Sequence, residues 1–361
     1  MNKRKVLIYI FFLKSGAGKS AVTYANALTR DGYEVTVVSG HSSPAMLSKL
    51  DDRIEVKLTH SPRSYRAIPH LRAALRECGP DVVLVIGGGN VYAYMASRLL
   101  SGFKGPLVVR EAVSPRILIE SENGYVAGLL KKFLLKTAYR RASRVIALTK
   151  AMREEMTDYW GVPHDHIAWI PNGVSVPSSS PKISKDSQIP TILSVGRLQP
   201  QKDHLTLLRA FSLVRAERPC RLLLAGDGKE RGRLEGLARD LKIESDVVFL
   251  GYVDDVSDLY MEASLSVLSS RYEGFGHVLI ESLAYGCPVV ATDCPTGPAE
   301  VINTESIGLL AKVGDHYDLA SKMLTALDTE YESSTLIARA EDFSIAKANE
   351  RIIALFENAE R

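Results

Sequence analysis

The stretch Glu273-Gly-Phe-Gly-His-Val-Leu-Ile-Glu281 places two glutamates with seven residues between them and two glycines shortly after the first. A glycine-rich turn lets backbone N–H groups approach phosphate or sugar oxygens at the start of a helix. A carboxylate accepts two hydrogen bonds from a vicinal diol, here on a sugar at one end and on a ribose at the other. The pattern predicts a strand–turn–helix that clamps a nucleotide sugar; the alternative is an ordinary strand–turn–helix with solvated acids.

On both sides of this stretch, short β-branched runs alternate with helical patterns, which predicts parallel sheets with crossover helices. In the first half we expect strands at Val6–Phe12, Glu34–Ser39, Glu55–Leu58, Asp81–Ile86, Leu107–Arg110, Arg144–Leu148 and Ile167–Ile170. In the second half we expect Thr191–Val195, Arg221–Ala225, Val247–Leu250, Leu265–Leu268 and Pro288–Thr292. Helices are expected near 20–31, 67–77, 90–101, 126–142, 150–160, 203–217, 230–241, 255–262, 276–285 and 297–302, with a last one after Phe343.

The chain has 361 residues, which suits two domains of about 180 residues each. We predict an N-terminal domain over 1–175, a Ser-, Pro- and Lys-rich linker over 176–190, a C-terminal domain over 191–342 and a final helix over 343–361 that returns to the first domain. Both domains should be doubly wound, Rossmann-like α/β folds that face each other across a cleft. Ligands of such sheets bind beyond the carboxyl ends of the strands.

Composition indicates a soluble globular protein, with 46% hydrophobic and 24% charged residues. The four cysteines include no CxxC pair, so neither a zinc site nor a disulfide framework is expected, and a reducing cytoplasm fits best. The apolar run Val6–Leu13 follows a basic start but is too short for a signal peptide, and it predicts a buried strand. No apolar stretch reaches the ~20 residues of a membrane span.

Charge is distributed unevenly. Residues 1–175 carry 25 Lys and Arg against 14 Asp and Glu, and residues 176–361 carry 20 against 28. The basic residues of Leu129–Arg144 stand among leucines and aromatics. This stretch fits either an anionic membrane surface or a core-packed helix whose basic side chains snorkel. A peripheral position on the inner face of the membrane is therefore one expectation, and no pattern points to nucleic acid.

Gly196, Arg197 and then Lys202 follow the strand predicted at Thr191–Val195. A planar guanidinium and a point charge at a strand's carboxyl end are able to neutralise a departing diphosphate; the alternative is a solvated basic loop. No Asp-x-Asp motif stands near a strand end, so no metal site and no cofactor are expected.

Three further features lie at predicted strand ends. Thr296 and Gly297 open a helix whose N–H groups are able to meet a phosphate, and His277 is either a phosphate donor or a polar helix start. Ser15-Gly-Ala-Gly-Lys-Ser20 lacks the first glycine of a P-loop, because that position is Leu13. Gly16 there predicts a turn that approaches a phosphate or an acceptor.

Several motifs agree in order and spacing with one family. They are Gly196-Arg-Leu with Lys202, Ala225-Gly-Asp-Gly228, Glu273-Gly-Phe-Gly-His with Glu281, Gly286-Cys-Pro-Val-Val-Ala291, Ala25-Asn-Ala-Leu28, Gly32-Tyr-Glu-Val-Thr-Val-Val38, Arg144-Val-Ile-Ala147 and Ile170-Pro-Asn-Gly-Val174. Over nearly its whole length the chain resembles the retaining glycosyltransferases of family 4, with the GT-B fold. Asp293-Cys-Pro-Thr-Gly-Pro-Ala-Glu300 resembles bacterial members that build surface polysaccharides or lipid-linked oligosaccharides.

The resemblance implies roles for matching residues. Arg197 and Lys202 would hold the donor diphosphate, Glu273 the transferred sugar with the backbone of Phe275, Gly276 and His277 nearby, and Glu281 the ribose diol. Two departures lie on the acceptor side. Relatives carry Gly-Gly-x-Glu where this chain has Ser15-Gly-Ala-Gly18, and a histidine where it has Ala112, after Glu111.

The resulting expectation is a metal-independent, retaining transfer of a hexose or N-acetylhexosamine from a nucleotide-diphosphate sugar, with a UDP-sugar favoured, to a sugar or lipid-linked acceptor. Three alternatives stay open. A nucleotide-sugar epimerase of the same fold would need no acceptor, a P-loop ATPase would depend on Lys19, and a non-catalytic scaffold would bind no nucleotide.

Overall fold

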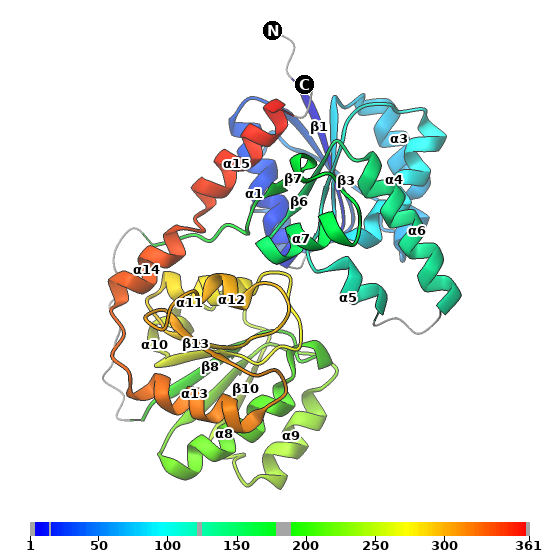
Figure 1. The fold of residues 1–361 in the computed structure, drawn as a ribbon. Coiled ribbons are helices and arrows are strands. Elements are labelled where there is room, and N and C mark those ends of the chain that lie inside the picture. Colours follow the sequence, from blue (N-terminus) through cyan, green and yellow to red (C-terminus); the bar gives the residue numbers. More distant parts are fainter. Residues whose placement is uncertain (1–3, 14–15, 121–124, 178–188, 359–361) are drawn as a thin grey trace. The chain divides into compact units, whose positions relative to one another are not determined.

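A computed structural model describes residues 4–13, 16–120, 125–177 and 189–358. The chain forms two compact units (Figure 1). Unit 1 comprises Met1–Gly173 and Ile345–Arg361, and unit 2 comprises Val174–Ser344. Ser15 and most of the predicted linker, residues 178–188, lie outside the described residues.

Unit 1 contains a seven-stranded sheet in the order β3-β2-β1-β4-β5-β6-β7, and every neighbouring pair is parallel. Its strands are β1 Lys5–Leu13, β2 Glu34–Ser42, β3 Glu55–Leu58, β4 Val82–Ile86, β5 Leu107–Arg110, β6 Arg144–Ala147 and β7 Ile167–Trp169. Its helices are α1 Gly16–Arg30, α2 Pro44–Leu47, α3 Ile68–Cys78, α4 Gly88–Ser101, α5 Pro115–Glu120, α6 Tyr125–Arg141, α7 Lys150–Asp158 and α15 Ile345–Asn358. Short 3₁₀ turns cover Ser64–Ala67 (η1) and His164–His166 (η2).

Unit 2 repeats this architecture with six parallel strands in the order β10-β9-β8-β11-β12-β13. The strands are β8 Thr191–Val195, β9 Arg221–Ala225, β10 Val247–Gly251, β11 Leu265–Leu268, β12 Val289–Thr292 and β13 Gly308–Ala311. The helices are α8 His204–Glu217, α9 Arg231–Asp240, α10 Ser257–Glu262, α11 His277–Ala284, α12 Pro298–Val301, α13 His316–Asp328 and α14 Ser333–Glu341, and a 3₁₀ turn covers Pro200–Lys202 (η3). Two doubly wound α/β units confirm the predicted fold class.

Burial on both faces explains the apolar character of β1. Ile8 and Ile10 belong to the core under α1, whereas Leu7 and Tyr9 point to the other face and are fully buried as well. Strands of a parallel sheet covered on both sides have this continuous apolar pattern. The run Val6–Leu13 is therefore an internal strand, as predicted.

The last helix, α15, belongs to unit 1 although it follows unit 2 in sequence (Figure 1). Ile352 and Phe356 lie in the same buried cluster as Leu28 of α1, and the Phe356 ring meets Tyr33 edge-on with centroids 6.3 Å apart. Burial of such apolar side chains stabilises the packing of a helix against its sheet. The chain therefore closes unit 1 with its own C-terminal segment.

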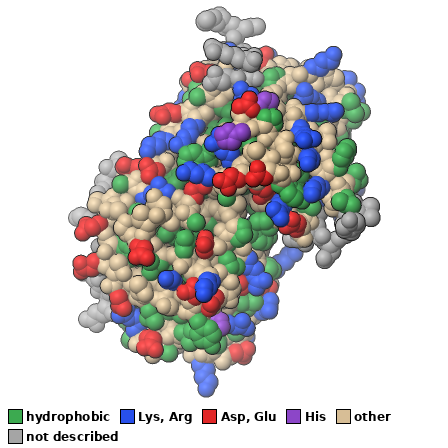
Figure 2. All heavy atoms as spheres, viewed as in Figure 1, with side chains coloured by type: hydrophobic (Ala, Val, Ile, Leu, Met, Phe, Trp, Pro, Cys, Tyr) green, Lys and Arg blue, Asp and Glu red, His purple; other side chains and the backbone are tan. Residues whose placement is uncertain are grey.

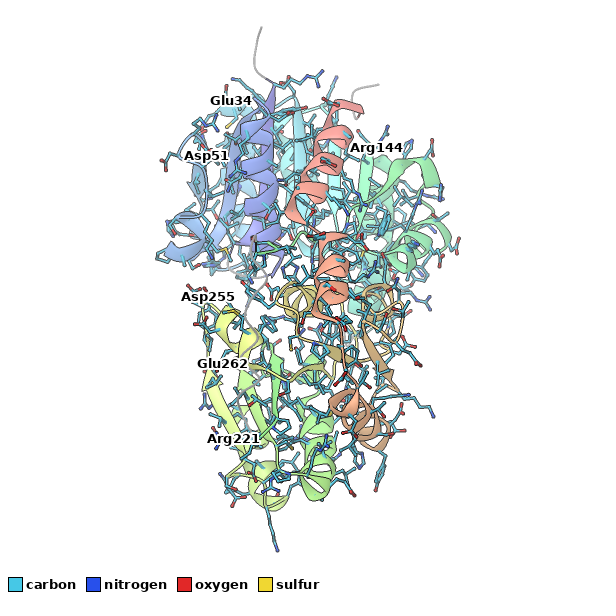
Figure 3. All side chains as sticks on the ribbon, turned by 90° about the vertical axis from the view of Figure 1, so that its left-hand side faces the viewer. Glu34, Asp51, Arg144, Arg221, Asp255 and Glu262 are labelled. Atoms are coloured by element: carbon cyan, nitrogen blue, oxygen red, sulfur yellow. The ribbon has the colours of Figure 1, made fainter. Side chains whose placement is uncertain are left out.

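The first residues of the strands mark the amino edge of each sheet. Glu34 and Arg144 begin β2 and β6, and Arg221 begins β9 (Figure 3). The opposite, carboxyl edges hold the residues that the sequence singles out as a site. All of the parallel strands of a unit end at the same edge, so residues far apart in sequence meet there.

Candidate functional site

Two tightly interlocked loops hold Arg197 at the carboxyl edge of unit 2. A Cβ on Gly226 would lie 1.9 Å from the Gly196 carbonyl oxygen, and a Cβ on Gly228 would lie 2.2 Å from the Leu198 carbonyl oxygen. Only glycine allows so close an approach of two backbones. Leu198 is fully buried, while Arg197 beside it is exposed. The loops thus anchor the neighbours of Arg197 and leave its guanidinium accessible.

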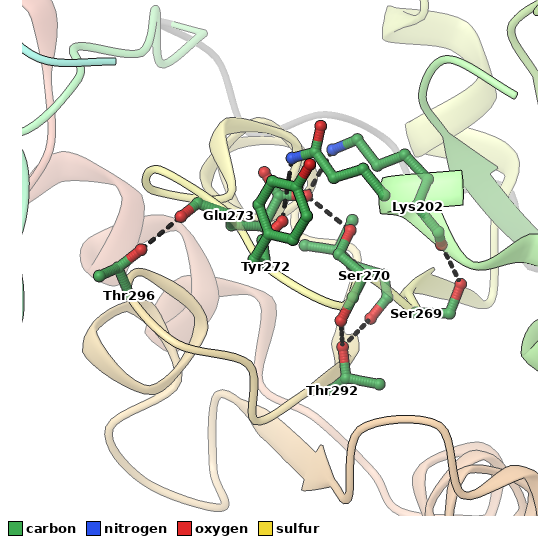
Figure 4. A network of polar contacts seen from close by, with 9 residues as sticks. Lys202, Ser269, Ser270, Tyr272, Glu273, Thr292 and Thr296 are labelled. Carbon is green, nitrogen blue, oxygen red and sulfur yellow. Dashed lines mark hydrogen bonds and ion pairs between the residues drawn. The ribbon is translucent and has the colours of Figure 1, made fainter. Parts of the chain in front are cut away.

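Lys202 and Glu273 meet although 71 residues separate them. The Lys202 Nζ lies 2.5 Å from Glu273 Oε1, and their side chains are only 15% and 9% exposed. Ser270 Oγ donates to the same carboxylate oxygen at 2.6 Å (Figure 4). A buried carboxylate with a cation and a hydroxyl donor is held in one position. The structure therefore brings together two residues that the sequence assigned to the donor site.

Hydroxyl groups fix the backbone around this pair (Figure 4). Ser269 Oγ donates to the Lys202 carbonyl at 2.8 Å, and Thr292 Oγ1 donates to the Ser270 carbonyl at 2.6 Å. Thr296 Oγ1 donates to the carbonyl of Glu273 itself. Sequence reasoning did not find Ser269, Ser270 or Thr292, since serine and threonine at strand ends give no signal of their own.

His277 and Glu281 form the second polar pair, on α11. His277 Nε2 lies 3.2 Å from Glu281 Oε1, and Tyr260 Oη lies 3.5 Å from the other carboxylate oxygen. Burial, followed by the Glu281 charge, raises the pKa of Tyr260 well above its ordinary value, so its hydroxyl stays a donor. Gly276 precedes the helix with φ +80°, a conformation that glycine adopts without strain.

The turn before α12 packs against the backbone of the glycine-rich stretch. Thr296 and Gly297 have φ values of +64° and +98°, and a Cβ on Gly297 would lie 2.4 Å from the Phe275 carbonyl oxygen. Phe275 is 2% exposed, and its ring meets Phe343 edge-on at 5.3 Å. The Phe275 side chain is thus part of the core, and only its backbone is available near the turn.

His204 adjoins this site without having been predicted. It follows Lys202 by two positions and is buried, and Nδ1 has no hydrogen-bond partner among the described residues. Burial, and then the positive charge of Lys202, lower the pKa of His204 to about 4. His204 is therefore neutral near pH 7 and adds no positive charge beside Lys202.

In unit 1 the equivalent edge holds Glu111, directly after β5. Its carboxylate accepts hydrogen bonds from the Gly88 N–H and the Tyr139 hydroxyl, both at 2.8 Å. Burial raises the pKa of Glu111 to about 7, and these two hydrogen bonds oppose part of that shift. Glu111 thus ties the start of α4 to α6. Ala112, where relatives carry histidine, is half-buried, and Gly16 opens α1 in an exposed position.

Two family models match consecutive parts of the chain. The model described as Glycosyltransferase Family 4 matches residues 14–176, and the model described as Glycosyl transferases group 1 matches residues 176–343. The chain belongs to glycosyltransferase family 4. It is a glycosyltransferase, and the family membership predicted from the motifs is confirmed.

Similar proteins agree with this assignment. The glycosyltransferase is 28% identical to the GalNAc-α-(1→4)-GalNAc-α-(1→3)-diNAcBac-PP-undecaprenol α-1,4-N-acetyl-D-galactosaminyltransferase of Campylobacter jejuni, over 98% of this chain and 99% of that protein. It is 27% identical to the N-acetylgalactosamine-N,N′-diacetylbacillosaminyl-diphospho-undecaprenol 4-α-N-acetylgalactosaminyltransferase of the same species, over 71% of this chain and 69% of that protein.

Solved structures identify the fold of the glycosyltransferase. HepE of Anabaena, solved in complex with UDP-glucose, superposes with a TM-score of 0.83 at 22% identity, covering 98% of this chain and 99% of that chain. This likeness establishes the GT-B fold. Within the described residues of the glycosyltransferase, no group of three or more His, Cys, Asp or Glu side chains is placed to hold a metal ion.

Proposed function

We propose that this glycosyltransferase moves a hexose or N-acetylhexosamine from a UDP-sugar to a lipid-linked sugar acceptor, with retention of the anomeric configuration and without a metal ion. The observation that carries the proposal is the set of charged groups at one edge of unit 2. Arg197 is exposed there, and Lys202 and Glu273 are locked together beside it. HepE with UDP-glucose and the undecaprenol-linked substrates in the names of the Campylobacter relatives support the donor and the acceptor class.

The chemistry follows from where charge develops. As the bond between the sugar's anomeric carbon and the diphosphate oxygen breaks, negative charge grows on the leaving diphosphate. Arg197 and Lys202 stabilise that charge more strongly in the transition state than in the bound substrate. The acceptor oxygen then bonds to the anomeric carbon on the face that the diphosphate leaves. Its proton passes to a diphosphate oxygen, so the protein supplies no nucleophile.

Glu273 and Glu281 are proposed to orient the donor. Glu273 is held by Lys202 and Ser270, so its remaining acceptor capacity is directed at a hydroxyl of the transferred sugar. Glu281, on α11, is proposed to accept from the ribose diol. Backbone N–H groups at Gly276 and His277 and at Thr296 and Gly297 are proposed to meet the phosphates.

A thermal-shift panel of nucleoside diphosphates and nucleotide sugars tests the donor. UDP and the true UDP-sugar should raise the melting temperature, because they bind the native state alone. Replacement of Arg197 by Ala should remove the shift and lower the transfer rate about 10- to 150-fold. Arg221→Ala is the matched control, since Arg221 is exposed at the opposite, amino edge of the same sheet (Figure 3).

Transfer assays test the retention of configuration and the independence from a metal ion. NMR of the product should show the donor's anomeric configuration, and excess chelator should leave the rate unchanged. Inversion, a chelator-sensitive rate, or equal rates for Arg197→Ala and the parent enzyme would each refute the corresponding part of the proposal.

The acceptor's membrane position is proposed from α6 and the end of α4. Leu130 and Phe133 of α6 are 60% and 67% exposed, and Leu99 of α4 is 83% exposed. On its other side, α6 packs Leu135 and Tyr139 into the core. Lys and Arg side chains stand beside hydrophobic ones where Figure 1 draws α6 (Figure 2). No helix of the described residues is long and apolar enough to cross a membrane.

We infer that this surface lies on an anionic membrane, because apolar side chains enter the interface while cations meet lipid phosphates. The enzyme should sediment with vesicles that contain anionic lipid and stay in the supernatant when the vesicles are zwitterionic. Phe133→Ser should weaken the retention. Tyr252→Ser, at an 80% exposed aromatic of unit 2, is the control. Sedimentation that does not depend on anionic lipid would show that this surface is not an anionic-membrane contact.

A further inference from the structure

Arg339 of α14 holds the end of α12 through its guanidinium. Its Nε donates to the Val301 carbonyl at 3.0 Å, and its Nη2 donates to the Glu300 carbonyl. Its Nη1 donates to Asp342 Oδ2 at 2.9 Å, and the Arg339 side chain is only 16% exposed. Glu300 and Val301 are the last two residues of α12, and the last carbonyls of a helix have no partner within it. Arg339 therefore caps α12 with hydrogen bonds from a fixed, mostly buried cation.

The same guanidinium also packs on the ring of Phe343. The guanidinium carbon lies 4.7 Å from the ring centroid, within the range of a cation–π contact. Phe343 is 5% exposed and meets the buried ring of Phe275 edge-on. Because buried side chains are closely packed, the position of the Phe343 ring limits that of Phe275. Arg339 thus supports the glycine-rich stretch as well as α12.

The two supported segments touch each other where the donor phosphates are proposed to bind. Thr296 Oγ1 donates to the Glu273 carbonyl, and a Cβ on Gly297 would overlap the Phe275 carbonyl oxygen (Figure 4). Thr296 has a φ of +64°, a left-handed conformation that β-branched residues rarely adopt. Such a backbone persists only where the surrounding structure holds it. The contacts of Arg339 hold this turn from the far end of α12.

We propose that Arg339 is a positioning residue of the donor site. It fixes the Thr296–Gly297 turn against the backbone of Phe275–His277, so that the N–H groups of both segments are aligned for the donor diphosphate. The inference rests on the proposed function, in which these N–H groups meet the phosphates. Two carbonyls, a carboxylate and a ring occupy the guanidinium, so Arg339 acts through α12 and Phe343 and touches no ligand.

Calorimetric titration of the full-length enzyme with UDP and with uridine tests this role, because uridine lacks the diphosphate. Arg339→Met should weaken the binding of UDP about tenfold and leave that of uridine within twofold. Partial unfolding would lower both apparent affinities by the same factor. The ratio of the UDP affinity to the uridine affinity therefore reports on the phosphate site, and a role in stability alone would not change it.

Three further variants sharpen the test. Arg339→Lys keeps a cation near the carbonyls of α12 and should recover part of the UDP affinity. Phe343→Leu keeps an apolar side chain in the core but removes both ring contacts, and it should lower the UDP-to-uridine ratio about threefold. Arg218→Met is the matched control. Arg218 forms an ion pair with Asp328 at 2.8 Å and lies just before β9, at the opposite, amino edge of the sheet.

The outcomes separate this inference from the proposed function. An unchanged UDP-to-uridine ratio in Arg339→Met, or an equal change in Arg218→Met, would overturn the positioning role alone. If Arg339→Met does not fold, Phe343→Leu decides: a lowered ratio supports the role and an unchanged ratio overturns it. A parent enzyme that binds UDP no more tightly than uridine would overturn the proposed donor site, and with it the premise of this inference.

Discussion

Lys202 and Arg110 occupy comparable places in the two units, and their surroundings differ. Each follows or ends a strand at the carboxyl edge of a parallel sheet, and each is mostly or fully buried. Lys202 has a carboxylate at 2.5 Å, whereas Arg110 has only a hydroxyl and an amide oxygen. Unit 2 therefore pairs its buried cation with a carboxylate at hydrogen-bond distance, whereas unit 1 holds Arg110 with neutral oxygens and a longer-range attraction to Glu111.

The difference shows how one architecture supports two ways of holding a buried cation. In unit 2 the ion pair fixes the position of Glu273, so that a polar ligand meets a preorganised acceptor. In unit 1 the guanidinium of Arg110 is held by the neutral oxygens of Ser20 and Asn172. Three stability experiments test this comparison, since removal of Lys202 and removal of Arg110 should change the free energy of unfolding differently.

The largest effect is expected from breaking the pair in unit 2. Lys202→Met should lower the free energy of unfolding by about 3–5 kcal/mol, because it leaves the Glu273 carboxylate buried without its cation. The double variant Lys202→Met/Glu273→Gln should recover a large part of that loss, which denaturant titration measures as a coupling energy. Additive losses would mean that the two side chains do not support each other.

The next effect concerns Glu111, whose pKa is raised from 4.5 to about 7 by burial. A carboxyl with a raised pKa contributes most below its unfolded pKa, and that contribution is lost as the pH rises through the folded value. Glu111→Gln keeps an acceptor for the Gly88 N–H and cannot ionise.

The parent should therefore lose roughly 3 kcal/mol relative to Glu111→Gln between about pH 4.5 and pH 8. Melting temperatures of both proteins across this range provide the measurement. Parallel profiles would show that Glu111 titrates normally despite its burial.

The smallest effect is expected from Arg110→Met. The change removes a buried charge and two unsatisfied donors, while the hydroxyl of Ser20 still donates to Asn172 at 3.1 Å. The free energy of unfolding should stay constant or rise by about 1 kcal/mol. Denaturant titration beside Lys202→Met compares the two directly. A loss above about 2 kcal/mol would show that Arg110 stabilises the fold and that the contrast with Lys202 is wrong.

Much of the fold was predictable because parallel strands are short and continuously apolar. Leu107–Arg110, Thr191–Val195, Arg221–Ala225 and Leu265–Leu268 have the predicted bounds. No helix or strand was predicted for residues 303–342, yet they form β13, α13 and α14. In α13 the buried Leu319, Met323 and Ala326 recur at helical spacing, so the signal was present and was missed.

The candidate site was predictable to the extent that it follows strand ends. Lys202 and Glu273 were assigned to one site, and the structure joins them. Ser270 and Thr292 were not found, and neither was the burial of Arg110. The hydrogen-bond partners of a side chain depend on which loops pack against it. Gly88 and Tyr139, which both donate to Glu111, lie 23 and 28 residues from it in sequence.

The two α/β halves, the family and the residues of the glycine-rich stretch could be read from the amino-acid sequence, because apolar periodicity and motif spacing are local properties of the chain. Which charged side chains form close ion pairs followed from the folded chain and not from the sequence pattern. Whether a buried cation has a carboxylate within hydrogen-bond distance is set by the packing of remote segments, and no spacing encodes it. That is why Lys202 and Arg110, alike as basic residues at the carboxyl edges of their sheets, differ in their hydrogen-bond partners.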